Sequence, residues 1–290
     1  MWAVVVNPIS GSGKGAKVGR EVTGYFASKK ESYQVITATN AEKLQANLST
    51  FLERYGHECK GVICVGGDGL VHLTLQLVVP RNIAFAVVPA GTGNDFARSL
   101  NSQSVDLHQY LDHVTSEQPT AIDLGLVDSE WFGAILSTGF DSVVNERANS
   151  MKRPKGPMKY NFAIALELPK FRPLHYQITL DSRVIETEAM LIAVGNGNSY
   201  GGGMKVCPDA DMTDGLFDVM ILRPVSKIEF LKVFPKVFSG EHIQHPSVEI
   251  HRTSRVLLDA PAVAYADGER IGGLPVRAEC IAGAGLSWPL

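Results

Sequence analysis

Three glycine-rich turns carry most of the residues in this sequence that could do chemistry. They are Asn7-Pro8-Ile9-Ser10-Gly11-Ser12-Gly13-Lys14-Gly15, Gly66-Gly67-Asp68-Gly69 and Pro89-Ala90-Gly91-Thr92-Gly93-Asn94-Asp95. Glycine lets backbone N–H groups approach an anion closely, and a helix that begins after the turn adds a favourable dipole. The turns are therefore candidates for binding phosphate groups.

Two of these turns also carry a carboxylate, Asp68 and Asp95. A carboxylate beside a phosphate is favourable only if a cation such as Mg²⁺ is also bound. A single glycine-rich turn is more often only a tight connection between a strand and a helix. Three such turns, two of them with an aspartate, favour a phosphate site that uses Mg²⁺.

The elements around these turns predict an α/β domain with a doubly wound, mostly parallel sheet. Val18, Val22 and Phe26 recur at helical spacing, and residues 44–55 show a second helical pattern. The short apolar runs that predict strands are residues 3–6, 33–37, 61–65 and 84–88. Strands that are apolar throughout indicate a sheet covered on both faces, where ligands bind beyond the carboxyl ends of the strands. The three turns should therefore lie together.

From about residue 123 the pattern changes to short, closely spaced strands. Turn-forming groups such as Asp181-Ser182, Gly195-Asn196-Gly197 and Asp267-Gly268 separate them. Helical patterns interrupt the strands only near residues 157–168 and 226–238. We predict a β-rich, largely antiparallel C-terminal domain.

Composition limits the class of protein. Of the 290 residues, 45% are hydrophobic and 20% are charged, with a formal net charge of −3, which gives no sign of nucleic-acid binding. The four cysteines are scattered without a CxxC pair and predict free thiols. Asn7-Pro8 ends the first apolar run, and no apolar run approaches the ~20 residues that span a bilayer. We expect a cytoplasmic protein.

Two familiar phosphate-binding motifs do not fit. A Walker A loop needs Ser or Thr after its lysine, whereas Lys14 is followed by Gly15. A Rossmann site needs an acidic residue at the end of the second strand, where this sequence has Thr37-Ala38-Thr39.

With these turns considered, the sequence resembles the bacterial diacylglycerol kinase and lipid kinase family, whose catalytic domain is shared with sphingosine and ceramide kinases. The matching stretches are residues 7–13, 66–69, 91–98 (GTGNDFAR), 138–141, 201–205 (GGGMK), 208–219 (PDADMTDGLFDV) and 267–269. The GGDG turn also occurs in NAD kinases and phosphofructokinases, whereas GTGNDFAR together with GGGMK is specific. The resemblance implies an ATP- and Mg²⁺-dependent enzyme that phosphorylates a hydroxyl of diacylglycerol, giving phosphatidic acid, or of a related lipid.

The resemblance also implies the site residues. Glu269 matches the proton acceptor, and Asp267, Asp68 and Asp95 are the other catalytic candidates. The nucleotide-binding candidates are Asn7, Pro8, Ile9, Ser10, Gly11, Thr39, Gly66, Gly67, Asp68, Gly69, Leu70, Val71, His72, Thr92 and Asn94. The Asp-Gly pair before Glu269 also predicts a hairpin turn, and both interpretations are compatible.

A structural Mg²⁺ site is the third implication of the resemblance. Its ligands would be the Asp214 carboxylate and the backbone carbonyls of Asp211 and Leu216. Oxygen ligands around a turn suit Mg²⁺. From the residues alone, an acidic surface turn is the alternative. His242, His245 and His251 lack further ligands and are predicted to lie on the surface.

The family organisation implies ATP on one domain, lipid on the other and chemistry between them. We predict a nucleotide-binding domain at residues 1–122, a lipid-binding domain at 123–276 and a segment at 277–290 that returns to the first domain. Peripheral contact with the inner membrane surface is expected, and a homodimer is a candidate assembly. A basic segment could attract anionic lipid or be a solvated helix face; it comprises Lys152, Arg153, Lys155, Lys159, Lys170 and Arg172, with Tyr160, Phe162 and Phe171 interleaved.

One position departs from the family pattern. Leu73 stands where bacterial members commonly have a glutamate, and Leu70 and His72 are similar to the sphingosine kinase version. Two alternatives therefore stay open. One is a soluble small-molecule kinase of the NAD kinase type, and the other is a catalytically silent lipid-binding module.

Overall fold

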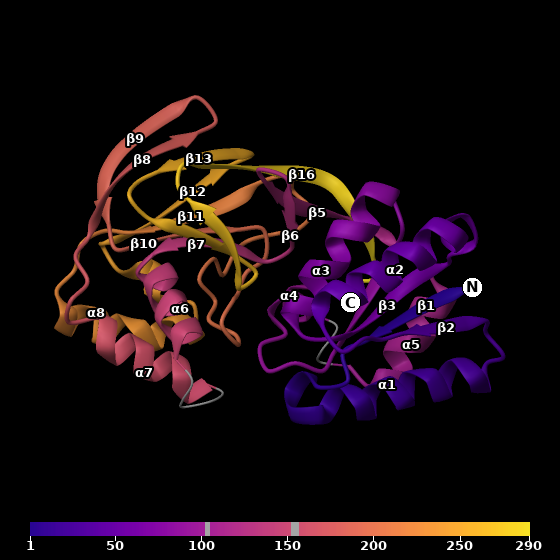
Figure 1. Cartoon of the computed structure of the whole chain (residues 1–290). Helices are drawn as coiled ribbons and strands as arrows, with labels where there is room; N and C mark the ends of the chain where they lie inside the picture. The colour runs from indigo at the N-terminus through magenta and orange to yellow at the C-terminus, as the bar shows by residue number, and fades with distance from the viewer. Residues whose placement is uncertain (102–104, 152–156) are drawn as a thin grey trace.

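The computed structural model describes residues 1–101, 105–151 and 157–290. Figure 1 shows two parts side by side, a parallel sheet covered by helices and a sandwich of strands with helices at its far end. Among the described residues, no helix is both long enough and apolar enough to cross a membrane. All four cysteines are free thiols, as predicted.

Four parallel strands form the sheet of the first part. Their order is β2 (Tyr33–Ile36), β1 (Trp2–Val6), β3 (Gly61–Gly66) and β4 (Phe85–Pro89). On one face pack α1 (Ser10–Ser28) and α5 (Leu107–Ser116). On the other pack α2 (Ala41–Tyr55), α3 (Asp68–Val78) and α4 (Asp95–Ser99). The predicted doubly wound architecture is confirmed, because strands that are apolar on both faces must be covered on both faces.

The second part is a sandwich of two sheets. One sheet is antiparallel throughout and runs β12 (Val248–Thr253), β11 (Phe217–Leu222), β10 (Leu191–Gly195), β7 (Ile135–Gly139), β14 (Val263–Ala266) and β15 (Glu269–Gly273). The other contains β5 (Thr120–Val127), β6 (Glu130–Phe132), β8 (Leu174–Leu180), β9 (Arg183–Ala189), β13 (Arg255–Asp259) and β16 (Val276–Ser287). Leu136, Ile178 and Val219 belong to the apolar core between them. The predicted antiparallel β domain is confirmed.

The strand β16 joins the two parts. It pairs with β13 and β5 in the sandwich, and its end pairs in parallel with β4 at Ser287 and Phe85. Trp288 then packs against Trp2, with ring centroids 5.9 Å apart. One sheet therefore runs through both parts, which the change of sequence pattern near residue 123 did not show. The division at 122/123 falls inside β5 and stays a proposal.

Helices gather at the end of the sandwich that lies away from β16. They are α6 (Phe140–Ser150), α7 (Pro157–Glu167) and α8 (Lys227–Val233), followed by the 3₁₀ turn η3 (Phe234–Phe238). The Ser226 side chain caps α8 by accepting a hydrogen bond from Glu229 N. The helical pattern predicted over 226–238 breaks after Val233, because Pro235 has no N–H to continue the helix.

Candidate active site

The three glycine-rich turns lie together at the carboxyl ends of β1, β3 and β4. Asn7 N donates to Val65 O at 3.1 Å, and Ala90 N donates to Gly66 O at 2.7 Å. Gly67 and Gly91 are in close contact, since a Cβ atom added to Gly91 would lie 2.5 Å from Gly67 Cα. A larger residue at position 91 would push the second and third turns apart.

Asp68 and Asp95 face each other across Gly93. A Cβ atom added to Gly93 would lie 2.6 Å from Asp68 Oδ2 and 3.2 Å from Asp95 Oδ2. Asp68 accepts hydrogen bonds from Asn94 N (2.8 Å) and Phe96 N (3.3 Å). Asp95 accepts from Gly202 N (2.9 Å) and Gly203 N (2.8 Å) in the second part. Asp68 therefore fixes the third turn, and Asp95 connects the two parts.

The pKa values of the Asp68 and Asp95 carboxyl groups are both raised. Burial, followed by repulsion from Asp95, raises the pKa of Asp68 to about 6. Burial also raises the pKa of Asp95, although the Gly202 and Gly203 amides and Arg98 act against the shift. Ionising two neighbouring buried aspartates costs free energy, and a nearby cation lowers this cost. The carboxylate oxygens of Asp68 and Asp95 are therefore suited to bind a hard divalent cation.

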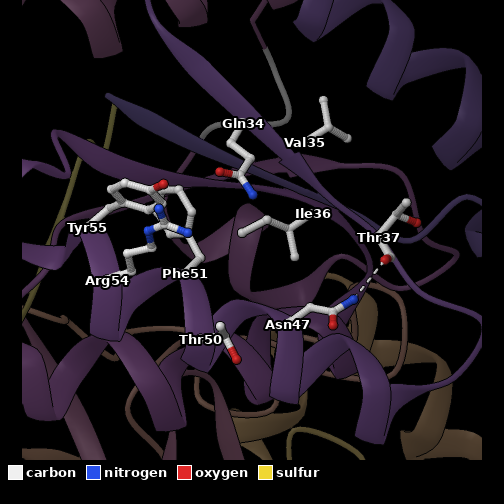
Figure 2. Close-up of a pocket in the computed structure, with 9 residues that line it drawn as sticks. All are labelled: Gln34, Val35, Ile36, Thr37, Asn47, Thr50, Phe51, Arg54 and Tyr55. Carbon is white, nitrogen blue, oxygen red and sulfur yellow. Dashed lines mark hydrogen bonds between the residues drawn. The ribbon is translucent and has the colours of Figure 1, made fainter.

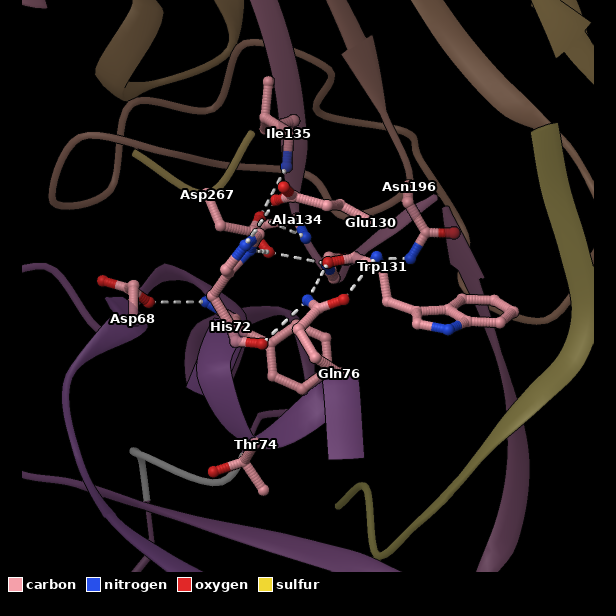
Figure 3. Close-up of polar contacts among 12 residues, drawn as sticks. Asp68, His72, Thr74, Gln76, Glu130, Trp131, Ala134, Ile135, Asn196 and Asp267 are labelled. Carbon is pink, nitrogen blue, oxygen red and sulfur yellow. Dashed lines mark hydrogen bonds and ion pairs between the residues drawn. The ribbon is translucent and has the colours of Figure 1, made fainter. Parts of the chain in front are cut away.

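The turn between β14 and β15 brings a third and a fourth carboxylate to the same place. Asp267 Oδ2 accepts from Gly133 N at 2.7 Å, and Oδ1 accepts from Ala134 N (2.8 Å) and Ile135 N (3.3 Å) (Figure 3). Asp267 and Gly268 have φ values of 50° and 86°, so the Asp-Gly pair does form the predicted hairpin turn.

Glu269 differs from the three aspartates. Its side chain is exposed, and a Cβ atom added to Gly69 would lie 3.1 Å from Glu269 Oε1. Within residues 1–101, 105–151 and 157–290, the Glu269 carboxylate has no hydrogen bond or ion pair. It therefore lies close to the start of α3 and is available to a ligand.

His72 is buried on α3 and connects the first part to the sandwich. Its Nε2 lies 3.4 Å from Glu130 Oε2 and its Nδ1 lies 3.7 Å from Asp267 Oδ2 (Figure 3). Burial would lower the pKa of His72, but Asp267, Glu269 and Glu130 outweigh it and the net pKa is raised. The contacts of the imidazole are thus with carboxylates of the second part.

Five of the other residues predicted to bind a nucleotide fall into two groups. The side chains of Leu70 and Val71 are buried in the core of the first part, so these residues could reach a nucleotide only through their backbone. Ile9, Thr39 and Thr92 are exposed, and Thr39 lies in a bend beyond the end of β2.

Side-chain bonds hold two of the predicted nucleotide-binding turns in shape. Asn94 has a φ of 58°, and its Oδ1 accepts from Gly91 N at 2.8 Å, which closes the third turn. Ser10 Oγ donates to Asn7 O at 2.9 Å and closes the first.

Two amide side chains and one aspartate that sequence reasoning missed hold the site together. Gln76 pairs with the backbone of Trp131 in both directions, at 2.7 and 2.9 Å (Figure 3). Asn196 donates to Asp123 O and Gly133 O. The buried Asp123 carboxylate accepts from Gly215 N (2.6 Å) and Gly283 N (2.8 Å). No local pattern marks these residues, because their partners lie far away in the sequence.

A separate pocket of about 350 Å³ lies beside the edge strand β2 (Figure 2). Ile36, Phe51 and Arg54 are among its lining residues, and Asn47 Nδ2 donates to Thr37 O at 3.3 Å at one end. It contains none of the four carboxylates. We therefore place the candidate active site at the glycine-rich turns.

The predicted metal ligands lie in one turn, but an arginine already occupies it. Asp214 Oδ1 accepts from Leu216 N at 2.9 Å, and Asp214 Oδ2 pairs with Arg252. Arg252 Nε also lies 3.3 Å from Asp218 Oδ1. Because a guanidinium stands where a cation would be needed, the residues fit Mg²⁺ only if Arg252 moves. Mg²⁺ at this turn stays a prediction.

The competition between Arg252 and Mg²⁺ can be measured without nucleotide. We expect Mg²⁺ to raise the Tm of Arg252→Gln more than the Tm of the wild type, because the substitution frees the Asp214 carboxylate. Equal shifts in both proteins would mean that Mg²⁺ does not bind at this turn.

The three candidate surface histidines differ in environment. His242 is buried, with Nε2 3.1 Å from Val206 O, so the prediction that it lies on the surface was wrong. His245 and His251 are partly buried and pair with Glu229 and Glu249. In the part of the chain that the structure describes, no group of three or more His, Cys, Asp or Glu is arranged to hold a metal.

The raised pKa of Asp68 predicts a pH dependence of stability. The folded carboxyl group titrates near 6 and the unfolded group near 3.8, so stability is lost as the pH rises through this window. In the absence of nucleotide and Mg²⁺, we expect the wild type to gain about 1 kcal/mol relative to Asp68→Asn when the pH falls from 8 to 5. Urea unfolding of both proteins at the two pH values measures the difference. A constant difference between them would contradict a raised pKa for Asp68.

Comparison with known proteins agrees with both parts of the structure. A model described as the diacylglycerol kinase catalytic domain matches residues 1–127, and one described as the YegS C-terminal NAD kinase beta sandwich-like domain matches residues 134–285. A diacylglycerol kinase of Bacillus anthracis has a similar fold, with a TM-score of 0.75 at 18% identity, over 100% of this chain and 96% of that one.

Curated relatives carry the same description. A diacylglycerol kinase of Mycobacterium tuberculosis is 33% identical over 97% of this chain and 92% of its own length. One from Bacillus subtilis is 31% identical over 74% of this chain and 72% of its own length. With a relative of this identity matched over nearly all of both chains, and with both parts of the fold accounted for, the chain belongs to the diacylglycerol kinase family.

Proposed function

We propose that this protein transfers the γ-phosphoryl group of ATP, with Mg²⁺, to a hydroxyl of diacylglycerol, giving phosphatidic acid, or to the hydroxyl of a related lipid. One observation carries the proposal. Glu269, whose carboxylate makes no hydrogen bond or ion pair among the described residues, lies close to Gly69 in one of the glycine-rich turns that also hold Asp68 and Asp95. A free carboxylate opposite a phosphate-binding edge is what a hydroxyl acceptor needs.

The four carboxylates would have different roles. Glu269 would take the proton of the acceptor hydroxyl while the hydroxyl oxygen bonds to the terminal phosphorus of ATP. In the same step the bond from that phosphorus to the bridging oxygen of ATP breaks. Asp267 accepts hydrogen bonds from three backbone amides and holds the turn that carries Glu269. Asp68 and Asp95 hold the third turn and the contact between the parts. We therefore assign these three aspartates to positioning.

Asp68 and Asp95 are also the residues that would hold Mg²⁺ with the bound nucleotide. Their raised pKa values show that ionising both is costly, and a nearby cation would relieve this cost. When bound, Mg²⁺ supplies positive charge that neutralises the phosphate oxygens.

The nucleotide and the lipid would occupy opposite sides of the gap. We propose that the turns at residues 7–11, 66–69 and 92–94 bind the phosphates, with Thr39 near the nucleotide, and that the sandwich binds the lipid. Such a protein would work in the cytoplasm, in contact with the inner membrane surface. The homodimer stays a prediction, and sedimentation at several protein concentrations tests it.

Transfer of labelled phosphate from ATP tests the proposed function. The assay uses Mg²⁺ and mixed micelles of diacylglycerol, sphingosine, ceramide or monoacylglycerol, with NAD in solution as a further acceptor. Labelled phosphatidic acid is the expected product. Label on NAD would favour the NAD kinase alternative. No label on any acceptor, with ATP still bound, would favour a silent lipid-binding module.

A further inference from the structure

The residue that follows Glu269 is held by a contact of its own. Arg270 Nε donates to Glu146 Oε1 at 2.7 Å, and the hydroxyl of Tyr265 donates to the same oxygen at 3.0 Å. Glu146 lies on the helix α6, whereas Tyr265 lies on β14 and Arg270 on β15. One carboxylate therefore joins the helix to both strands of the hairpin that carries Glu269.

The contact lies in water rather than in the core. The Arg270 side chain is 54% exposed and the Glu146 side chain is 47% exposed. The hydrogen bond from Arg270, followed by the one from Tyr265, lowers the pKa of Glu146. Because exposed ion pairs contribute little to stability, we expect this pair to affect the direction of the hairpin side chains more than the stability of the fold. Three basic residues that follow α6 lie outside the described residues, namely Lys152, Arg153 and Lys155.

The hairpin places Arg270 and Glu269 on opposite faces of the sheet. Tyr265 is the strand partner of Arg270. Ala266 is the strand partner of Glu269 and belongs to the apolar core between the two sheets. Residues directly opposite each other share a face, and successive residues of a strand alternate between faces. Holding Arg270 against α6 therefore directs Glu269 away from this helix, to the side where it lies close to Gly69.

The strand β15 needs such an anchor because it is short and lies at the edge of its sheet. It has five residues, Glu269–Gly273, and pairs with β14. Gly268 precedes it with a φ of 86°, and Gly272 within it has a φ of 153°. Glycine gives the backbone more freedom than any other residue. A contact from outside the sheet would therefore limit how far the Glu269 side chain can turn.

We propose that Glu146 is a positioning residue for phosphoryl transfer, which acts through Arg270 and directs the Glu269 carboxylate toward the start of α3. The proposal rests on the proposed function, in which Glu269 takes the proton of the acceptor hydroxyl. A proton acceptor that has the right orientation for only part of the time lowers kcat in proportion. The binding of ATP and of the lipid should not change, because neither Glu146 nor Arg270 belongs to the glycine-rich turns.

Phosphate transfer by four variants tests the proposal. Glu146→Ala, Arg270→Ala and the double variant Glu146→Ala/Arg270→Ala should each lower kcat about fivefold, which is as much as an exposed ion pair can shift an equilibrium between two arrangements. The KM values for ATP and lipid and the Tm should stay close to those of the wild type. The double variant should lose no more than either single variant, because both remove the same contact. Arg270→Lys should recover most of the rate, since its ammonium group can still pair with Glu146.

The matched control is Asp112→Ala, which removes a similar contact between α1 and α5. Asp112 Oδ1 accepts from the buried Tyr25 hydroxyl at 2.7 Å and from Lys29 Nζ at 2.7 Å. The control should keep the wild-type kcat. An equal loss of kcat in Asp112→Ala, or losses that add up in the double variant, would overturn the proposal.

A second measurement needs no catalytic activity. Burial lowers the pKa of His72, and the charges of Asp267 and Glu269 are among the effects that outweigh it. In an NMR titration without nucleotide or Mg²⁺, Glu146→Ala should lower the pKa of His72, because Glu269 is then free to turn away. The same substitution should have no effect in a protein that already carries Glu269→Gln.

The titration separates this proposal from the proposed function. An unchanged pKa of His72 in Glu146→Ala, or the same shift with and without Glu269→Gln, would mean that Glu146 does not direct Glu269. If the wild type phosphorylates no lipid, the proposed function fails, and the titration of His72 still decides whether Glu146 holds Glu269 in place.

Discussion

Replacing Glu269 by Gln is expected to lower kcat about 10²–10⁴-fold, the range that a positioned proton acceptor typically contributes. Gln keeps the size and shape of the side chain but cannot take the proton of the acceptor hydroxyl. Because the Glu269 carboxylate makes no hydrogen bond or ion pair within the described residues, its loss should leave the fold and ATP binding unchanged. The measurement is labelled phosphate transfer to diacylglycerol, with ATP affinity and Tm determined for the same preparation.

The control for Glu269→Gln is Glu188→Gln, an exposed residue on β9 far from the glycine-rich turns. It should keep the wild-type kcat. If Glu269→Gln also retained full activity, the proton acceptor would be another group, and the assignment of Asp68, Asp95 and Asp267 to positioning would have to be revised. Equal, near-zero turnover of the wild type and Glu269→Gln with every lipid would contradict the kinase proposal itself.

Replacing Asp123 by Ala is expected to lower the free energy of unfolding by about 3 to 5 kcal/mol, because two buried charge-assisted hydrogen bonds are lost and their donors stay unsatisfied. The donors are Gly215 N and Gly283 N, at 2.6 and 2.8 Å. The first lies beside the acidic turn that leads into β11, and the second lies in β16, which joins the two parts. The carboxylate therefore holds together segments that no other single side chain named above connects. Urea unfolding measures the loss.

The matched control for Asp123 is Asp259→Ala on β13. Asp259 is exposed, and its substitution should change the free energy of unfolding by less than about 0.5 kcal/mol. The loss in free energy of unfolding for Asp123→Asn should lie between the losses for Asp123→Ala and Asp259→Ala, since the amide oxygen can still accept one of the two hydrogen bonds. A loss for Asp123→Ala no larger than that for Asp259→Ala would mean that Gly215 and Gly283 find other acceptors without cost.

The sequence by itself determined the elements and the place where the turns meet. Strands such as β1 and β3 are apolar at every position, and the glycine-rich turns follow them directly, so the parallel arrangement is a consequence of local pattern. Pro235 has no N–H to donate, so the helix α8 ends at Val233, before the end of the helical pattern predicted over 226–238. The residue types at the turns also indicated phosphate chemistry, because glycine and aspartate act there through the geometry of their immediate neighbours.

The tertiary structure alone decided which of the four carboxylates is free. Asp95 binds amides 107 and 108 residues away, and Asp267 binds amides 132 to 134 residues away, whereas Glu269 has no such partner among the described residues. The tertiary structure likewise brings Arg252 to Asp214 and buries His242. The physical reason is the same throughout: periodicity records how a segment meets the core next to it, but a hydrogen bond between distant segments leaves no spacing in the sequence.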